Sequence, residues 1–235
     1  MIVRFINGAS IPVPLKPGID QMHKFSLFLA ALFLFLMGCS SPETSKENHV
    51  RIFIVHGYGA STTDHWFPWL KQEMEKKGAK VSIIDLPTPK DPKTNEWEQS
   101  LRDQAQPVDK NTYFVAHSLG SITLLRFLEE KHPAEIGGYI LVSGFNENLP
   151  ALPQLNTFIE PNIHYAELIR ITKNRTVISA KDDAIVPSNL SRNLADSLNA
   201  KFIETNHGGH FLGEEGYTRF PLVLEELQKQ IDARQ

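Results

Sequence analysis

The sequence contains very little cysteine: Cys39 is the only one among 235 residues. A single cysteine cannot form a disulfide within its own chain, so the fold must be stable without one even in an oxidising compartment. The sequence also lacks a basic patch with interleaved aromatic residues, and its formal net charge is −3. Nucleic-acid binding therefore has no support in the sequence.

Metal ligands are scarce as well. His207 and His210 lie close together, but no cysteine or glutamate pair stands near them at the spacing of a metal site. We therefore expect no metal ion and no other cofactor. The sequence has no internal repeats, and its length and 41% hydrophobic content fit one globular domain behind an N-terminal segment that does not pack.

No apolar run is long enough to cross a bilayer comfortably. The run Phe25–Met37 has about 13 residues, which is the length of a signal-peptide core. A short positive start that includes Lys24 precedes it, and the run ends in Leu-Met-Gly-Cys, which looks like a bacterial lipobox. We predict that residues 22–38 form a lipoprotein signal peptide and that Cys39 becomes the acylated (palmitate-carrying) first residue of the mature protein.

The segments that flank this signal have the composition of unpacked chain. Residues 1–21 have no convincing periodicity, and a secretory signal begins near the start of a protein, so we expect translation to start at Met22. Residues 39–48 are polar and predict a tether. Several acyl chains would hold the protein stably on a membrane of the bacterial cell envelope, and Ser40 favours the outer membrane in a two-membrane cell. The alternative is an uncleaved amphipathic anchor with an incidental cysteine.

The most informative motif is Ala116-His117-Ser118-Leu119-Gly120. Residues 111–115 before it are rich in β-branched and aromatic residues, whereas residues 121–130 after it place apolar side chains at helical spacing. A serine in the sharp turn between a strand and a helix is typical of the nucleophile elbow of α/β-hydrolases. The motif predicts that Ser118 is a nucleophile. The alternative is that this serine only caps the helix, because serine is a preferred capping residue.

Two later segments supply the carboxylate and the general base that a serine nucleophile needs. Residues 176–187 form a predicted strand and an acidic turn, in which the hydrolase pattern Asp-x-x-Val-Pro favours Asp183 over Asp182. A further predicted strand is followed by Asn-His-Gly-Gly-His-Phe, in which Gly-His-Phe favours His210 over His207. The resulting order of Ser, Asp and His along the chain is that of the α/β-hydrolases.

Backbone N–H groups must stabilise the oxyanion that forms when the serine attacks. Residues 50–55 are an apolar, strand-like run that ends in His56-Gly57-Tyr58-Gly59. In the hydrolase fold the N–H after this His-Gly pair points at the oxyanion, which makes Tyr58 the first predicted donor. The second is the N–H of Leu119, directly after the predicted nucleophile.

Each of these motifs has an ordinary explanation when it is taken alone. An Asp-Asp turn is usually a solvated loop, and a Gly-Gly-His loop usually has no catalytic role. However, the serine motif, the acidic turn, the Gly-His-Phe loop and the His-Gly loop each follow the C-terminal end of a predicted strand. Open α/β sheets bind ligands at that end. Their joint occurrence favours an active site.

The chain resembles the family of small serine hydrolases that includes retinoblastoma-binding protein 9. The resemblance runs from about Val50 to the C-terminus and includes the segment His65-Trp66-x-x-Trp69, the Asp-Asp-x-x-x-Pro turn and Gly-His-Phe. It implies an α/β-hydrolase domain over residues 49–235, with a mostly parallel sheet, helices on both faces and a short lid. The alternation of strand-like and helix-like segments agrees, and residues 217–231 are predicted as the last helix. The proline-rich segment 144–165 is either the lid or acyl-pocket wall, or an ordinary connecting loop.

The predicted function is hydrolysis of a carboxylic ester, or a related acyl bond, through an acyl-enzyme on Ser118. The resemblance implies carboxylesterase-like or peptidase-like activity, so a peptidase or amidase of the same fold is one alternative. A non-catalytic binding protein on a hydrolase scaffold is the alternative from another class. The expected partners are a small-molecule acyl substrate and, through the lipid on Cys39, a membrane.

Overall fold

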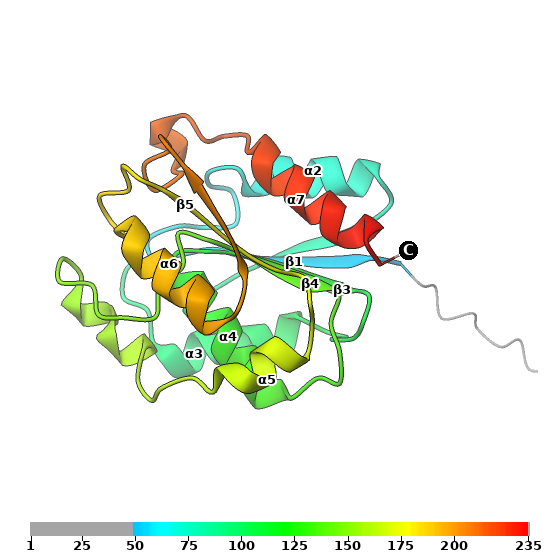
Figure 1. The fold of residues 1–235 in the computed structure, drawn as a ribbon, viewed down its shortest axis with the longest axis horizontal. Helices are drawn as coiled ribbons and strands as arrows, with labels where there is room; N and C mark the ends of the chain where they lie inside the picture. The colour runs from blue at the N-terminus through cyan, green and yellow to red at the C-terminus, as the bar shows by residue number, and fades with distance from the viewer. Residues whose placement is uncertain (1–48, 235) are drawn as a thin grey trace, which may run out of the picture. The chain divides into compact units, whose positions relative to one another are not determined.

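A six-stranded parallel sheet forms the centre of the computed structural model, which describes residues 49–234 (Figure 1). The strand order is β2-β1-β3-β4-β5-β6, and every neighbouring pair is parallel. The strands are β1 (Arg51–Val55), β2 (Lys80–Ile84), β3 (Thr112–His117), β4 (Gly138–Val142), β5 (Arg175–Ala180) and β6 (Lys201–Thr205). The predicted signal peptide, Cys39 and the tether lie outside the described residues.

Helices connect consecutive strands, as parallel pairing requires. They are α2 (Phe67–Lys76), α3 (Thr94–Gln104), α4 (Leu119–Lys131), α5 (Tyr165–Arg170), α6 (Ser188–Ser197) and α7 (Pro221–Asp232), with short 3-10 helices η1 (Pro153–Phe158) and η2 (Gly213–Glu215). In the part of the chain from residue 49 to 234, no helix is both long enough and apolar enough to cross a membrane.

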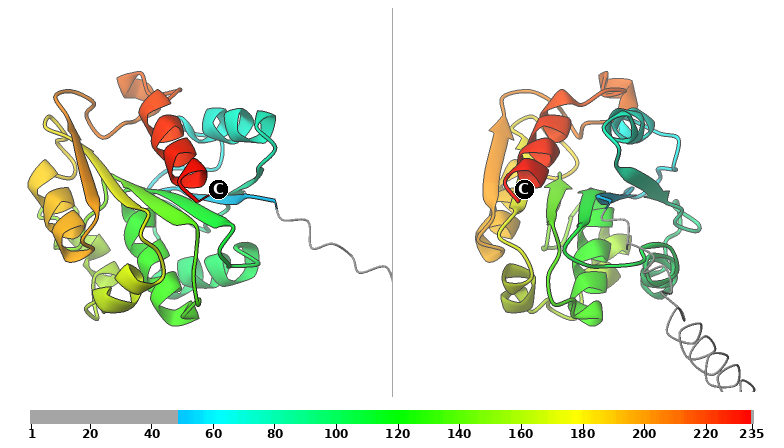
Figure 2. Two further views of the ribbon diagram at one scale, coloured as in Figure 1. Left: turned by 45° about the vertical axis from the view of Figure 1, so that its right-hand side comes forward. Right: turned by 90° about the vertical axis from the view of Figure 1, so that its right-hand side faces the viewer.

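Helices cover both faces of the sheet. On β1, Phe53 and Val55 belong to the apolar cluster that includes α3, α4, α5 and α6, whereas Ile52 and Ile54 belong to the cluster that includes α2 and α7. This alternation arises because successive side chains of a strand point to opposite faces. Figure 2 shows α2 and α7 on one side of the sheet and the green helices on the other. The structure thus confirms the predicted α/β-hydrolase fold.

The last helix begins later than the sequence predicts. α7 starts at Pro221 rather than at residue 217. The ring of Phe220 stacks on Phe211 at 4.6 Å between centroids, and the ring of Tyr217 packs edge-on against both. These contacts hold residues 217–220 outside the helix. Proline suits the first helical position because it has no N–H to leave unpaired.

The proline-rich segment 144–165 contains η1 and leads into α5, a helix that the sequence analysis does not predict. Arg126, a buried residue of α4, anchors this segment. Its Nε donates to the carbonyl oxygen of Phe158 at 2.6 Å, and its Nη2 donates to that of Pro161 at 2.7 Å. The segment is therefore fixed to the helix that follows the predicted nucleophile.

The strand order also determines where a ligand would bind. The chain moves from β1 to β2 on one side of β1, and then crosses to β3 on the other side. Such a switch point leaves a crevice at the carboxyl ends of the two central strands. The loop after β1 and the turn after β3, which hold the predicted oxyanion donors and Ser118, both lie at that point.

Candidate active site

Ser118 occupies a strained turn between β3 and α4. Its φ is +53° and its ψ is −125°, a backbone conformation that is uncommon for a residue other than glycine. Such strain costs on the order of 1–3 kcal/mol and is typical of functional sites. The N–H of Ser118 donates to the carbonyl oxygen of Val142 at 2.8 Å, which ties the turn to the neighbouring strand. This is the geometry of a nucleophile elbow.

The loop after β1 and the first turn of α4 meet at this elbow with no room for extra atoms. A Cβ on Gly120 would lie 2.4 Å from the carbonyl oxygen of His56. A Cβ on Gly57 would lie 2.9 Å from the Cβ of Ser118. Real Cβ contacts are not this short, so glycine at both positions is what lets the two backbones approach each other.

The two predicted oxyanion donors lie on these two segments. Tyr58 lines the same cavity as Ser118, and Leu119 is the first residue of α4. The ring of His56 holds the loop before Tyr58: its Nδ1 donates to the next residue's carbonyl oxygen at 3.0 Å, and its Nε2 accepts the N–H of Leu86 at 3.4 Å. Burial lowers the pKa of His56, which favours the neutral ring that this donor–acceptor pair requires.

His210 and Asp183 form a buried pair. Nδ1 of His210 lies 2.9 Å from Oδ2 and 3.1 Å from Oδ1 of Asp183, and the two side chains are 4% and 0% exposed. The carboxylate also accepts the N–H groups of Ile185 and Val186 at 2.9 and 2.8 Å, and the hydroxyl of Ser143 at 2.8 Å. These bonds fix the carboxylate and, through it, the imidazole ring. The second ring nitrogen of His210 is left on the side away from the carboxylate.

The neighbouring carboxylate, Asp182, makes different contacts. It accepts the N–H of Gly209 at 2.9 Å, and its other oxygen lies 3.3 Å from Nδ1 of His207. The bond from Gly209 holds the pKa of Asp182 below its ordinary value. The structure therefore pairs His210 with Asp183 and not with Asp182. Between residues 49 and 234, no group of three or more His, Cys, Asp or Glu side chains is placed to hold a metal ion.

A cavity of about 280 Å³ is lined by Ser118 and His210. The loops after β1 and β5 and the segment 144–165 all contribute to its wall. His117 lines the cavity as well. The other lining side chains are uncharged and mostly apolar: Tyr58, Ala151, Leu152, Ala184, Ile185 and Leu212. Ala151 and Leu152 place the proline-rich segment at the wall, as the sequence predicts for one of its two alternatives.

Comparison with known proteins identifies the family to which this geometry belongs. The sequence model of the serine hydrolase family matches residues 52–229. The chain belongs to the serine hydrolase family. This confirms the predicted resemblance to the small serine hydrolases.

Individual relatives agree with this assignment. The chain is 43% identical over 178 residues to a protein of Bacillus subtilis (strain 168) that is named "Putative hydrolase YdeN". The match covers 75% of this chain and 94% of that relative. The crystal structure of the ydeN gene product has a TM-score of 0.76 at 42% identity, and covers 77% of this chain and 98% of its own.

Two more distant proteins match, one in sequence and one in structure. Serine hydrolase RBBP9 of Rattus norvegicus is 22% identical over 174 residues, which is 73% of this chain and 91% of that protein. The structure of mouse alpha/beta hydrolase domain-containing protein 10 has a TM-score of 0.59 at 15% identity, covering 79% of this chain and 90% of its own. At that identity the likeness shows the fold alone.

Two contacts in the site of this serine hydrolase involve residues to which the sequence analysis assigns no role. His117, which is buried beneath His210, donates from Nε2 to the carbonyl oxygen of His210 at 2.9 Å. Burial, and then the neighbouring His210, lower the pKa of His117 well below its ordinary value, which favours a neutral ring. Ser143, directly after β4, has a φ of +48° and donates to Asp183. Its only sequence signal is a hydroxyl at the carboxyl end of a predicted parallel strand.

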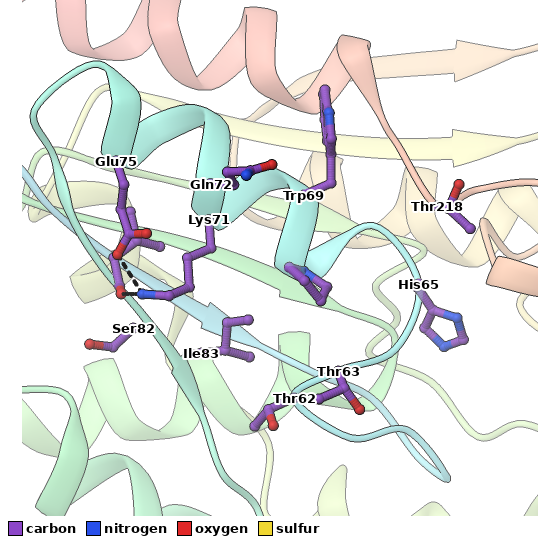
Figure 3. A pocket seen from close by; sticks show the side chains of 12 residues that line it. Thr62, Thr63, His65, Trp69, Lys71, Gln72, Glu75, Ser82, Ile83 and Thr218 are labelled. Atoms are coloured by element: carbon purple, nitrogen blue, oxygen red, sulfur yellow. Dashed lines mark hydrogen bonds and ion pairs between the residues drawn. The ribbon is translucent and has the colours of Figure 1, made fainter.

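A larger hollow, of about 910 Å³, lies beside α2 and the edge strand β2. Its lining includes Trp69, Lys71 and Glu75 (Figure 3). The ammonium of Lys71 donates to the carboxylate of Glu75 and to the carbonyl oxygen of Val81, both at 2.5 Å. Neither Ser118 nor His210 lines this hollow, so the predicted nucleophile and base lie at the smaller cavity.

Proposed function

We propose that the protein hydrolyses carboxylic esters through an acyl-enzyme formed on Ser118. One observation carries the proposal: the imidazole of His210, oriented by the buried Asp183, lines the same cavity as the strained Ser118. A serine, a carboxylate and a histidine in this chain order form the catalytic triad of α/β-hydrolases. A non-catalytic binding protein does not require the serine, the histidine and the carboxylate together. It also does not require the two glycines that bring the segments of the proposed oxyanion donors together.

The proposed reaction has two halves. Oγ of Ser118 attacks the carbonyl carbon while its proton passes to Nε2 of His210, and the N–H groups of Tyr58 and Leu119 stabilise the oxyanion. The tetrahedral intermediate collapses, the alcohol leaves with the proton from His210, and the acyl group stays on the serine oxygen. Water then attacks the acyl carbon as His210 takes its proton. The second tetrahedral intermediate collapses, the bond to Oγ of Ser118 breaks as His210 returns the proton to that oxygen, and the acid is released. Asp183 keeps the imidazole in the required tautomer and stabilises the imidazolium.

The cavity supports esters of short, uncharged acids as substrates. A charged acyl group would lose its hydration against apolar walls such as Leu152 and Ile185, and burial of an unpaired charge is costly. An aminoacyl substrate of an aminopeptidase would bring an ammonium, but none of the described residues that line the cavity has a carboxylate. Asp183 cannot pair with such an ammonium, because it is buried against His210 and its oxygens are already hydrogen-bonded. These features favour the esterase over the peptidase alternative.

The carboxylate assignment predicts unequal effects at two adjacent positions. Asp183→Asn should lower kcat by about three to four orders of magnitude, because the imidazole loses the partner that sets its tautomer. Asp182→Asn is the matched control: it keeps an oxygen that can accept the N–H of Gly209, and it should stay within a few-fold of the wild type. Steady-state hydrolysis of p-nitrophenyl butyrate, with circular dichroism to verify folding, measures both. Equal losses in the two variants would contradict the assignment.

The cavity wall predicts how activity depends on acyl length. For p-nitrophenyl esters, kcat/KM should be higher for acetyl and butyryl groups than for palmitoyl or for the charged succinyl group. Ala184→Leu should reduce butyryl turnover more than acetyl turnover because it fills the cavity, whereas Leu152→Ala should improve octanoyl turnover because it enlarges it. An unchanged chain-length profile in both folded variants would show that this cavity does not hold the acyl group.

We further propose that the protein is a lipoprotein of the bacterial cell envelope, anchored through Cys39. The support is the lipobox-like sequence that ends at Cys39 and the signal-like residues 22–38 before it. Cys39→Ala should leave the precursor uncleaved or release the protein from the membrane fraction. Fractionation of cells expressing the full chain, followed by intact-mass analysis, measures both effects. Unchanged processing and partitioning would rule the anchor out.

A further inference from the structure

We propose that His65 is a positioning residue that holds the loop carrying His210 in its working geometry. The inference rests on the proposed function for its catalytic consequence, but the contact itself can be tested without activity. The loop concerned, residues 206–213 between β6 and η2, is called the His210 loop below.

The central contact joins two segments that are far apart in the sequence. Nδ1 of His65 accepts the N–H of Gly213 at 2.8 Å, across 148 positions of the chain. His65 lies in the loop before α2 with a φ of +53°, which is unfavourable for its side chain. Its ring packs edge-on against Phe67 at 5.3 Å and against His117 at 5.8 Å between centroids. A strained residue held by packing, with its ring nitrogen aimed at a backbone N–H, is a candidate for a functional role.

Side chains from three other parts of the fold hold the His210 loop. Asp182 accepts the N–H of Gly209 before His210, and His117 donates to the carbonyl oxygen of His210 itself. His65 supplies the third tie, at Gly213. The first two ties lie on the N-terminal side of the loop or at His210. His65 is the long-range tie at the C-terminal end, where Glu215 of η2 also accepts the N–H of Leu212 at 2.9 Å. Loss of this tie would let the imidazole drift from Ser118, and a displacement of about 1 Å can cost on the order of a hundredfold in rate.

His65 differs from His117 in being accessible to solvent. It is partly exposed and lines the outer hollow beside α2, where Figure 3 shows its ring apart from the Lys71–Glu75 pair. The charged and titratable groups that face it are Asp64 from its own loop, Glu214 and Glu215 from η2, and three histidines, His56, His117 and His210. Protons can therefore reach His65 from the hollow without entering the substrate cavity.

The tie exists only while His65 is neutral. Burial lowers the pKa of His65 against the opposing effect of Asp64, so Nδ1 is free to accept at neutral pH. Protonation places a hydrogen on Nδ1, which then cannot accept from Gly213, and it adds a positive charge beside His210. The bond is thus present above the pKa of His65 and lost as the pH falls through it. The acid limb of the pH–rate profile should therefore contain the release of this bond.

Two substitutions separate the acceptor from other properties of His65. His65→Asn keeps an acceptor atom at the position of Nδ1, tolerates a positive φ and does not titrate. His65→Gly also tolerates the backbone conformation but has no acceptor. We expect kcat of His65→Asn within about threefold of the wild type at pH 8, and a loss of about tenfold or more for His65→Gly. The acid limb of His65→Asn should extend to lower pH than that of the wild type.

Amide hydrogen exchange tests the contact independently of catalysis. Peptides that cover residues 206–215 should exchange at least about tenfold faster in His65→Gly than in the wild type, and at the wild-type rate in His65→Asn. Equal exchange in all three proteins, or equal activity of the Asn and Gly variants, would overturn the proposal. A wild type that exchanges as expected but hydrolyses no ester and reacts with no serine-directed probe would refute the proposed function instead, and leave the His65–Gly213 tie standing.

Discussion

The close contact between the loop after β1 and the first turn of α4 is the constraint on which the site depends. Gly57 and Gly120 allow the two backbones to meet at the switch point of the sheet, and the strained Ser118 lies at their junction. Because the contact is made by backbone, it brings the segments of Tyr58 and Leu119 to the serine without help from flexible side chains. A side chain at either glycine would separate the proposed nucleophile from its proposed oxyanion donors.

The other half of the site is built differently. Asp183 is fixed by backbone N–H groups of its own turn and by Ser143, whereas His210 lies on a loop that enters from the far end of the chain. Long-range hydrogen bonds to side chains hold that loop in place. In the proposed mechanism a rigid strand–turn–helix unit therefore presents the nucleophile, and a tethered loop presents the base. One of these tethers depends on pH, because His65 accepts the N–H of Gly213 only while its ring is neutral.

Local sequence patterns are sufficient for the fold and for the grouping of the candidate site residues. The alternation of strands and helices predicts the parallel sheet, and the motifs around Ser118, Asp183 and His210 name three residues that the structure places at one cavity or in contact with its lining. Local sequence patterns do not predict features that depend on contacts between distant parts of the chain. Because Tyr217 and Phe220 pack against Phe211, α7 begins after these residues. The hydrogen bond between His65 and Gly213 joins residues too far apart in the sequence for a local motif to predict it.

The central claim is that Ser118 is an activated nucleophile. Its most direct test is to treat the folded domain with a fluorophosphonate and to measure the intact mass beside Ser118→Ala and His210→Ala variants. The account predicts one covalent adduct on the wild type, located to the peptide that contains Ser118, no adduct on Ser118→Ala, and strongly slowed labelling of His210→Ala. A folded wild type without an adduct, or a Ser118→Ala variant labelled as fast as the wild type, would contradict it.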